Sequence, residues 1–197
     1  MRAYPLISET QTPNSMFERK ALPMEPNGRI APSEAPPMVL RALRASDIDA
    51  VMVIEERCFP SHWSRDALQN ELGNACAFYV VAESGGRVVG YAGEWIIMDE
   101  AHITTIAVDP SDHGRRFGER LLIAILQEAR YRGARRATLE VRITNRVAQR
   151  LYEKYEFETV AIRRKYYQDT DEDALVMWVN DLFSPRVSEL LGQPFGP

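Results

Sequence analysis

The stretch that decides the fold is IAVDPSDHGRRFGERLL, at residues 106–122. Its first three residues are typical of a β-strand, Asp109-Pro110 is typical of a turn, and the apolar spacing after Gly118 predicts an amphipathic helix. Backbone N–H groups at the start of such a helix lack intrahelical acceptors, and the helix dipole is positive there, so this end favours an anion. We therefore predict that the loop binds the pyrophosphate of a cofactor.

Composition and charge narrow the class of protein. A length of 197 residues with 45% hydrophobic residues is typical of one globular domain with tails. The net charge of −4 provides no basic field for nucleic acid, and the apolar runs are too short to cross a membrane. We expect neither partner. The two cysteines, Cys58 and Cys76, form no C-x-x-C motif, which favours a cytoplasmic setting, and His62, His102 and His113 have no metal-ligand spacing, so we expect no metal.

The two ends differ from the middle of the chain. Residues 1–37 hold seven of the twelve prolines and show no helical or strand periodicity, so we predict a disordered, proline-rich leader there. Residues 184–197 hold three more prolines and are predicted to be a short tail. The interval between them, residues 38–183, is predicted to be a single folded domain.

Hydrophobic periodicity predicts the elements of this domain. Helices are expected from about Asp47, after the capping residue Ser64, over Gly118–Arg132 and from Asn145 to Tyr155. The expected strands are Val39–Leu43, Phe78–Glu83, Val88–Ile97, Ala101–Val108, Ala137–Ile143, Phe157–Arg163 and Ala174–Asn180. This mixture of strands and helices is a mixed α/β domain.

Four segments, in order along the chain, carry a family resemblance. They are IEERCFP at 54–60 with Trp63-Ser64, the stretch at 106–122, LEVR at 139–142 with Asn145 and LYE at 151–153, and IRRKYY at 162–167. On these segments, residues 38–181 resemble the GNAT acyl-CoA-dependent N-acetyltransferases, and more narrowly the RimI-type ribosomal-protein-alanine group. The resemblance implies a mostly antiparallel, twisted sheet flanked by helices, acetyl-CoA as co-substrate, and transfer of acetyl to a protein N-terminus, the alanine of a small-subunit ribosomal protein.

The resemblance also implies roles for individual residues. Glu140 stands where the group has its general base, and Tyr152 where it has its general acid. The acceptor is expected to lie against Trp63, Tyr166 and Tyr167. The residues expected to contact the pantetheine arm or the pyrophosphate are Ile106, Ala107, Val108, Gly114, Arg115, Arg116, Phe117, Gly118, Glu119 and Asn145.

Elementary chemistry agrees with these roles. An α-amine has a pKa of roughly 8, so a protonated acceptor must lose a proton before it attacks a thioester, and a carboxylate can take that proton. The departing thiolate needs a proton, which a phenol can give. Asn145 and Tyr152 are seven residues apart, which puts them on one face of a helix.

Each of these residues also has an ordinary structural interpretation. Glu140 can be a carboxylate in an ion pair near Arg142, Tyr152 can be packing at the edge of the core, and Asn145 can be a helix N-cap. Trp63 can likewise be a packing residue. Tyr166 and Tyr167 can be two half-buried aromatic residues of a polar hairpin. The sequence leaves both interpretations open at these positions.

Two positions depart from the family pattern. Arg116 and Glu156 stand where the family commonly has glycine. If the backbone at Glu156 needs a positive φ, this side chain costs about 1 kcal/mol. Arg116 either obstructs the approach of a phosphate or adds a guanidinium contact to it. Three hypotheses stay open: an N-terminal acetyltransferase, an acetyltransferase for lysine or small-molecule amines, and a non-catalytic acyl-CoA-binding module.

Overall fold

The computed structural model describes residues 38–192. The predicted leader at 1–37 and residues 193–197 lie outside this range. The strands are β1 (Met38–Ala42), β2 (Ala77–Ser84), β3 (Arg87–Ile97), β4 (Glu100–Val108), β5 (Arg136–Arg142), β6 (Glu158–Tyr167) and β7 (Glu172–Val179). The helices are α1 (Ile48–Cys58), α2 (Arg65–Glu71), α3 (Phe117–Tyr131), α4 (Arg146–Lys154) and α5 (Pro185–Leu191), with 3-10 turns η1 (Ala45–Asp47) and η2 (Pro110–Asp112).

The strands form one sheet in the order β1-β2-β3-β4-β5-β7-β6. Neighbouring strands are antiparallel except β4 and β5, which run parallel. The predicted mixed α/β, mostly antiparallel fold is therefore confirmed. Within residues 38–192, no helix is both long and apolar enough to cross a membrane.

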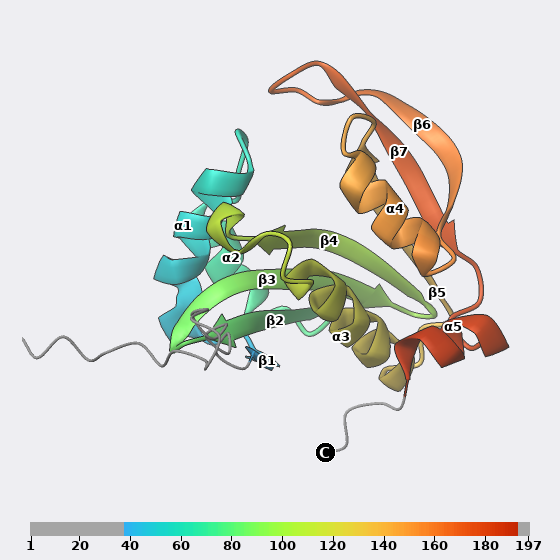
Figure 1. Cartoon of the computed structure of the whole chain (residues 1–197), viewed down its shortest axis with the longest axis horizontal. Coiled ribbons are helices and arrows are strands. Elements are labelled where there is room, and N and C mark those ends of the chain that lie inside the picture. The colour runs from blue at the N-terminus through green and yellow to red at the C-terminus, as the bar shows by residue number, and fades with distance from the viewer. Residues whose placement is uncertain (1–37, 193–197) are drawn as a thin grey trace, which may run out of the picture. The chain divides into compact units, whose positions relative to one another are not determined.

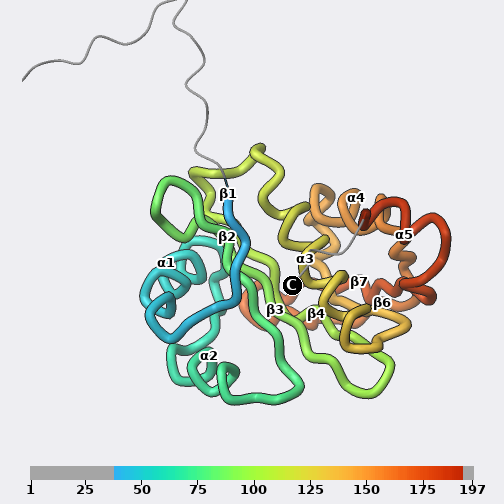
Figure 2. The backbone as a smooth tube through the Cα atoms, turned by 90° about the horizontal axis from the view of Figure 1, so that it is seen from below, coloured from blue at the N-terminus to red at the C-terminus, as the bar shows by residue number. Residues whose placement is uncertain are grey.

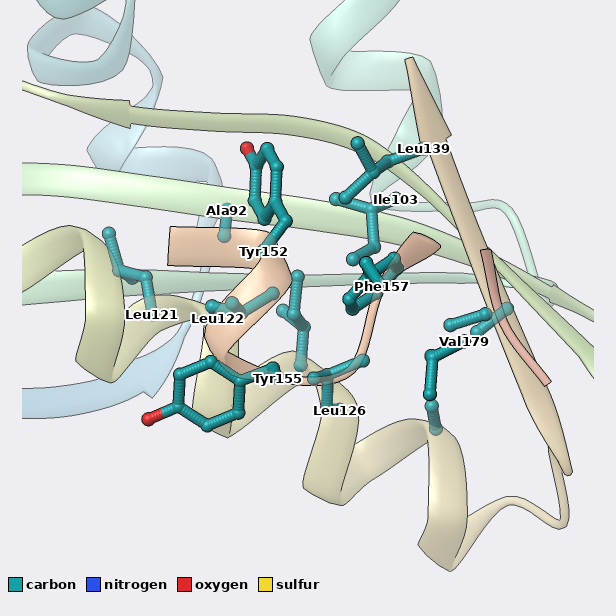
Figure 3. Packing of buried hydrophobic residues seen from close by; sticks show 14 of the residues in the cluster. Ala92, Ile103, Leu121, Leu122, Leu126, Leu139, Tyr152, Tyr155, Phe157 and Val179 are labelled. Carbon is teal, nitrogen blue, oxygen red and sulfur yellow. The ribbon is translucent and has the colours of Figure 1, made fainter. Parts of the chain in front are cut away.

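Helices cover both faces of the sheet (Figures 1 and 2). One apolar cluster joins α1 and α2 to the sheet, with Val51, Ile54 and Leu68 at its centre. The larger cluster joins α3, α4 and α5 to the opposite face. Figure 3 shows its packing around Leu121, Leu122 and Leu126 of α3 and Tyr152 of α4. The apolar positions predicted for α3, from Leu121 to Ala129, are buried there, which is why a helix with this spacing forms and packs.

The parallel strands β4 and β5 pair over a short distance only. Residues 100–103 of β4 pair with residues 136–139 of β5, and the register ends there. Beyond Ile103, β4 pairs with β3 alone, and beyond Leu139, β5 pairs with β7 alone. In Figure 1, β2–β4 extend to the left while β6 and β7 rise at the right. After Ile103 and Leu139 the two strands therefore separate, and their facing edges are not paired with each other.

A β-bulge lies at the point where β4 and β5 separate. Gly93 pairs with Thr105 and Glu94 with Ile103, so Thr104 is an extra residue on β4. An extra residue reverses the alternation of side chains. Accordingly Ile103 belongs to the α3 cluster, whereas Ala107, four residues later, belongs to the α1 cluster.

The predicted tail at 184–197 begins with a packed helix instead. Ser184 caps α5 by accepting a hydrogen bond from the N–H of Val187, and Pro185 occupies the first turn, where its missing N–H costs nothing. Val187 and Leu191 are buried in the larger cluster, and Gln127 of α3 donates to the carbonyl of Leu191. The proline content at 184–197 therefore led to a wrong prediction for residues 185–191.

Candidate active site

A cavity of about 420 Å³ lies where β4 and β5 separate. Its lining comes from α1, the loop between α1 and α2, β3, β4, β5, α4 and β6. The cavity brings together seven residues that the sequence predicted for the site, namely Trp63, Ile106, Glu140, Asn145, Tyr152, Tyr166 and Tyr167. Residues from positions 63 to 167 thus meet in one place, although no short motif contains them.

Glu140 projects from β5 into this cavity. Its Oε2 lies 3.0 Å from Nε2 of His102 on β4, and its Oε1 lies 3.0 Å from a guanidinium nitrogen of Arg163. The hydrogen bond with His102 and the charges of both partners hold the pKa of Glu140 below its ordinary value, although burial opposes this. The carboxylate is ionised at neutral pH. The ion-pair interpretation holds in part, but the partner is Arg163; Arg142 pairs with Asp169 and Glu172.

Tyr152 reaches the same cavity from α4. Its side chain is buried, its ring lies 5.9 Å from the ring of Phe157, and burial raises the pKa of its phenol. A raised pKa keeps the proton on the phenol at neutral pH. Figure 3 shows the ring of Tyr155, the C-cap residue of α4, pointing in another direction. The Tyr155 hydroxyl donates to Glu119 at 3.0 Å, so only Tyr152 of this pair lines the cavity.

Asn145 has the structural role that the sequence left open. Its Oδ1 accepts a hydrogen bond of 3.1 Å from the N–H of Ala148, which caps the N-terminus of α4. Asn145 also lines the cavity. The N-cap interpretation is therefore confirmed, and a contact to a ligand is compatible with it.

The two tyrosines at the end of β6 form an aromatic corner of the cavity. Tyr166 and Tyr167 meet edge to face, with ring centroids 5.1 Å apart. Arg142 stacks on Tyr167 at 3.9 Å, and the Tyr167 hydroxyl donates to the backbone carbonyl of Glu140 at 3.4 Å. Tyr167 is thus tied to β5, whereas Tyr166 remains 43% exposed.

The loop before α3 has the backbone geometry expected of an anion site. Arg120 donates the first backbone hydrogen bond of the helix, to the carbonyl of Arg116. The N–H groups of Phe117, Gly118 and Glu119 therefore lack an intrahelical acceptor. Gly114 adopts a positive φ of 78°. Residues 114–119, with Ala107 and Val108, lie outside the cavity lining, so the cavity does not include these predicted site residues.

Most side chains of this loop are engaged by the protein itself. Arg115 binds Asp112 at 2.7 Å and stacks on the buried ring of Phe117 at 4.6 Å. Glu119 accepts hydrogen bonds from Lys154 and Tyr155. The predicted contacts of Arg115, Phe117 and Glu119 to a phosphate would consequently come from their backbone. Arg116, by contrast, has an exposed side chain.

Both departures from the family pattern occupy the left-handed region of backbone space. Arg116 has a φ of 60° at the N-cap of α3, and Glu156 has a φ of 65° just after α4. Glycine adopts this conformation without steric cost, whereas other residues lose about 1 kcal/mol. The positive φ on which the predicted strain at Glu156 depends is therefore confirmed. At Arg116 the backbone has the left-handed conformation that glycine adopts most easily, although the residue is an arginine.

The carbonyl of Val108, at the end of β4, is already in use. Nε2 of His113 lies 2.9 Å from this oxygen, and the thiol of Cys58 donates to it at 3.3 Å. A ligand that pairs with the edge of β4 therefore meets free backbone nearer Ile106, which lines the cavity. Among residues 38–192, no group of three or more His, Cys, Asp or Glu side chains could hold a metal ion.

Sequence inspection missed three functional candidates in the cavity. They are Glu55, Trp95 and His102. A signal existed for Glu55, because Ile48, Val51 and Glu55 follow the helical spacing of a buried face. The sequence did not single out His102, because its contact with Glu140 depends on the pairing of β4 with β5, which no local pattern predicts.

Comparison with known proteins agrees with this geometry. Residues 48–157 match the sequence model of the Acetyltransferase (GNAT) family. A Bacillus subtilis (strain 168) protein, provisionally named a ribosomal protein bS18-alanine N-acetyltransferase, is 44% identical over 141 residues, which cover 71% of this chain and 93% of that protein.

Two solved structures have the same fold. The crystal structure of the ribosomal-protein-S18-alanine N-acetyltransferase from Escherichia coli superposes with a TM-score of 0.68 at 31% identity, covering 73% of this chain and 93% of that one. Arabidopsis thaliana NAA60 in complex with acetyl-CoA superposes with a TM-score of 0.66 at 16% identity, covering 73% and 98%. On the match of residues 48–157 and the identity to these relatives, the chain belongs to the GNAT family of acetyltransferases.

Proposed function

We propose that this protein transfers an acetyl group from acetyl-CoA to the α-amino group of a protein N-terminus. One observation carries the proposal: the ionised carboxylate of Glu140, hydrogen-bonded to His102, and the protonated phenol of Tyr152 line one cavity at the open edge of β4. A proton acceptor and a proton donor are the two groups that amine acylation needs. The relatives are named for acetylation of an alanine of ribosomal protein bS18, which favours the N-terminal alanine of a ribosomal protein as acceptor. The reaction would then take place in the cytoplasm.

The residues present fit acetyl-CoA. When bound, acetyl-CoA supplies an acetyl group activated as a thioester. The unpaired edge of β4 near Ile106 offers hydrogen bonds to an extended amide-bearing arm, as an added strand would. The N–H groups of Phe117, Gly118 and Glu119, with the helix dipole and the exposed guanidinium of Arg116, favour the phosphates. Asn145 borders the arm from α4.

Glu140 accepts the proton of the acceptor amine, and His102 holds its carboxylate in place. Glu140 is the general base of this scheme, and its ionised carboxylate attracts the ammonium form of the acceptor. Because its pKa is depressed, the carboxylate alone holds a proton weakly. The imidazole of His102, 3.0 Å away, hydrogen-bonds the carboxylate and so fixes its position in the cavity.

Tyr152 supplies the proton for the departing thiolate. Its pKa is raised by burial, so the phenol carries its proton at neutral pH and releases it only to a strong base. The aromatic residues Trp63, Tyr166 and Tyr167 form the acceptor side of the cavity. In this scheme the acyl group passes directly to the amine, without an acyl-enzyme.

The test is release of free thiol from acetyl-CoA in the presence of three peptides of otherwise equal sequence. The first has a free N-terminal alanine, the second has a blocked N-terminus and one lysine, and the third has neither amine. Turnover with the first peptide alone supports the proposal. Turnover with the second assigns the enzyme to lysine or small-molecule amines, and binding of acetyl-CoA without turnover favours a non-catalytic module.

A further inference from the structure

A buried carboxylate lies beside the acceptor side of the cavity and has no part in the proton transfers above. Glu55, in the last turn of α1, has no exposed surface. Burial raises the pKa of this carboxyl above its ordinary value, and hydrogen bonds only partly offset the effect. A carboxylate is costly to bury, so the interactions that hold it there identify what it does.

Glu55 joins the loop between α1 and α2 to the sheet. Its Oε2 accepts a hydrogen bond of 2.9 Å from the backbone N–H of Trp63. Its Oε1 accepts a hydrogen bond from the hydroxyl of Tyr91 on β3, and Thr105 on β4 donates to the same hydroxyl at 3.4 Å. One side chain therefore connects a helix, a loop and two strands.

The segment that Glu55 holds is a wall of the cavity. Phe59, Ser61 and Trp63 line it, and all three lie between the end of α1 and Ser64, which caps α2. The other hydrogen bonds of this segment are local, since Phe59 donates to the carbonyl of Glu55 and His62 contacts the carbonyl of Trp63. Phe59 also packs against the α1 cluster, but among the hydrogen bonds of the segment the one from Trp63 to the Glu55 carboxylate is the one that leads to the sheet, through Tyr91.

The second tryptophan of the cavity, Trp95, is also bound by a carboxylate, but through its side chain. The indole N–H of Trp95 donates to the carboxylate of Glu71 on α2 at 2.5 Å. Trp95 in turn lies 6.3 Å, centroid to centroid, from the ring of His102. Carboxylates from α1 and α2 thus bind both tryptophans that line the cavity.

We infer that Glu55 is a positioning residue for the acceptor: its carboxylate fixes the Trp63 segment against the sheet so that the acceptor side of the cavity is preformed. This inference rests on the proposed function. The reach of the side chain matters, because the bond to Trp63 spans 2.9 Å from a carboxylate fixed on α1. The charge matters less, since an amide oxygen can accept the same N–H.

Two conservative variants separate reach from charge. Glu55→Asp keeps the charge and withdraws the carboxylate by one methylene, so the bond to Trp63 is lost. Glu55→Gln keeps the reach and removes the charge, so that bond is kept. Glu56→Asp is the matched control, because Glu56 is exposed on the same helix turn.

The first measurement is amide hydrogen exchange of the segment containing Trp63, which does not depend on activity. We expect exchange at Trp63 to be about 10-fold faster or more in Glu55→Asp and close to wild type in Glu55→Gln and Glu56→Asp. Equal protection of Trp63 in folded Glu55→Asp and wild type would overturn the inference.

The second measurement is steady-state kinetics with the peptide carrying N-terminal alanine. We expect Glu55→Asp to raise the KM for the peptide about 10-fold, with the KM for acetyl-CoA unchanged and kcat within about 3-fold. Glu55→Gln should restore the peptide KM. An equal loss in both variants would show that the reach of the side chain is not sufficient, and would overturn positioning through the bond to Trp63. If the wild type fails to acetylate the peptide, the proposed function fails, whereas the exchange result still decides whether Glu55 fixes the loop.

Discussion

The contact between Glu140 and His102 makes the sharpest prediction. Replacing Glu140 with Gln keeps the size of the side chain and its place on β5, but removes the charge that pairs with His102 and Arg163. A positioned general base contributes about 10²- to 10⁴-fold to a rate. We therefore expect kcat/KM to fall by that factor, which corresponds to about 3–5 kcal/mol of transition-state stabilisation.

A double-mutant cycle tests whether the two residues act as one unit. His102→Gln keeps an amide near the position of Nε2 but removes the imidazole that contacts Glu140. Because the two side chains are in direct contact at 3.0 Å, the double variant should be no slower than about the slower single variant. Independent residues would instead multiply their separate losses.

The assay is the initial rate of thiol release at saturating acetyl-CoA, with calorimetric titration of CoA as a binding control. Glu83→Gln is the matched variant, since Glu83 on β2 is ion-paired with Arg41 but lies outside the cavity. A full rate in Glu140→Gln would refute the role of Glu140. Losses that multiply in the double variant would refute the coupled pair.

Three further predictions concern other parts of the domain. Tyr152→Phe should lower kcat about 10- to 100-fold without changing CoA affinity, whereas Tyr155→Phe should keep kcat, and equal rates for both would contradict the acid role. Glu156→Gly relieves the left-handed strain at φ 65° and should raise the midpoint of calorimetric unfolding by about 2–4 °C; an unchanged or lower midpoint would count against it. The hydrogen bond from Arg41 lowers the pKa of the buried Asp47. The ionised Asp47 therefore stabilises the folded state fully above pH 3.8, the ordinary pKa, and this stabilisation is lost as pH falls through the depressed pKa. Asp47→Asn should therefore cost about 2 kcal/mol in urea unfolding at pH 7 and less near pH 3, and a difference that does not shrink would contradict the ion pair.

The elements could be predicted from sequence because each carries its own periodicity. The spacing of Leu121, Ile125 and Ala129 defines α3, and the predicted bounds of most strands lie within two residues of those observed. The arrangement of the strands could not be predicted in this way. The parallel contact of β4 with β5, and the insertion of β7 between β5 and β6, depend on packing between distant segments.

The same distinction separates the predicted site residues from those that were missed. Glu140, Tyr152 and the loop before α3 lie in segments that resemble a known family, so a role could be predicted for each of them from the sequence. Glu55 and His102 acquire meaning only through partners 36 and 38 residues away, Tyr91 and Glu140. The helix α5 was missed because its prolines suggested a tail, although Pro185 is well placed at a helix start.

The position of the transferred acetyl group distinguishes an α-amine acceptor, as proposed above, from a lysine acceptor. The most direct measurement uses one peptide that offers both a free N-terminal alanine and an internal lysine, incubated with acetyl-CoA and the protein. Fragmentation mass spectrometry then locates the acetyl group on the product. We expect a single acetyl group, on the N-terminal alanine. Acetyl on the lysine, or an unmodified peptide under conditions where acetyl-CoA is bound, would contradict it.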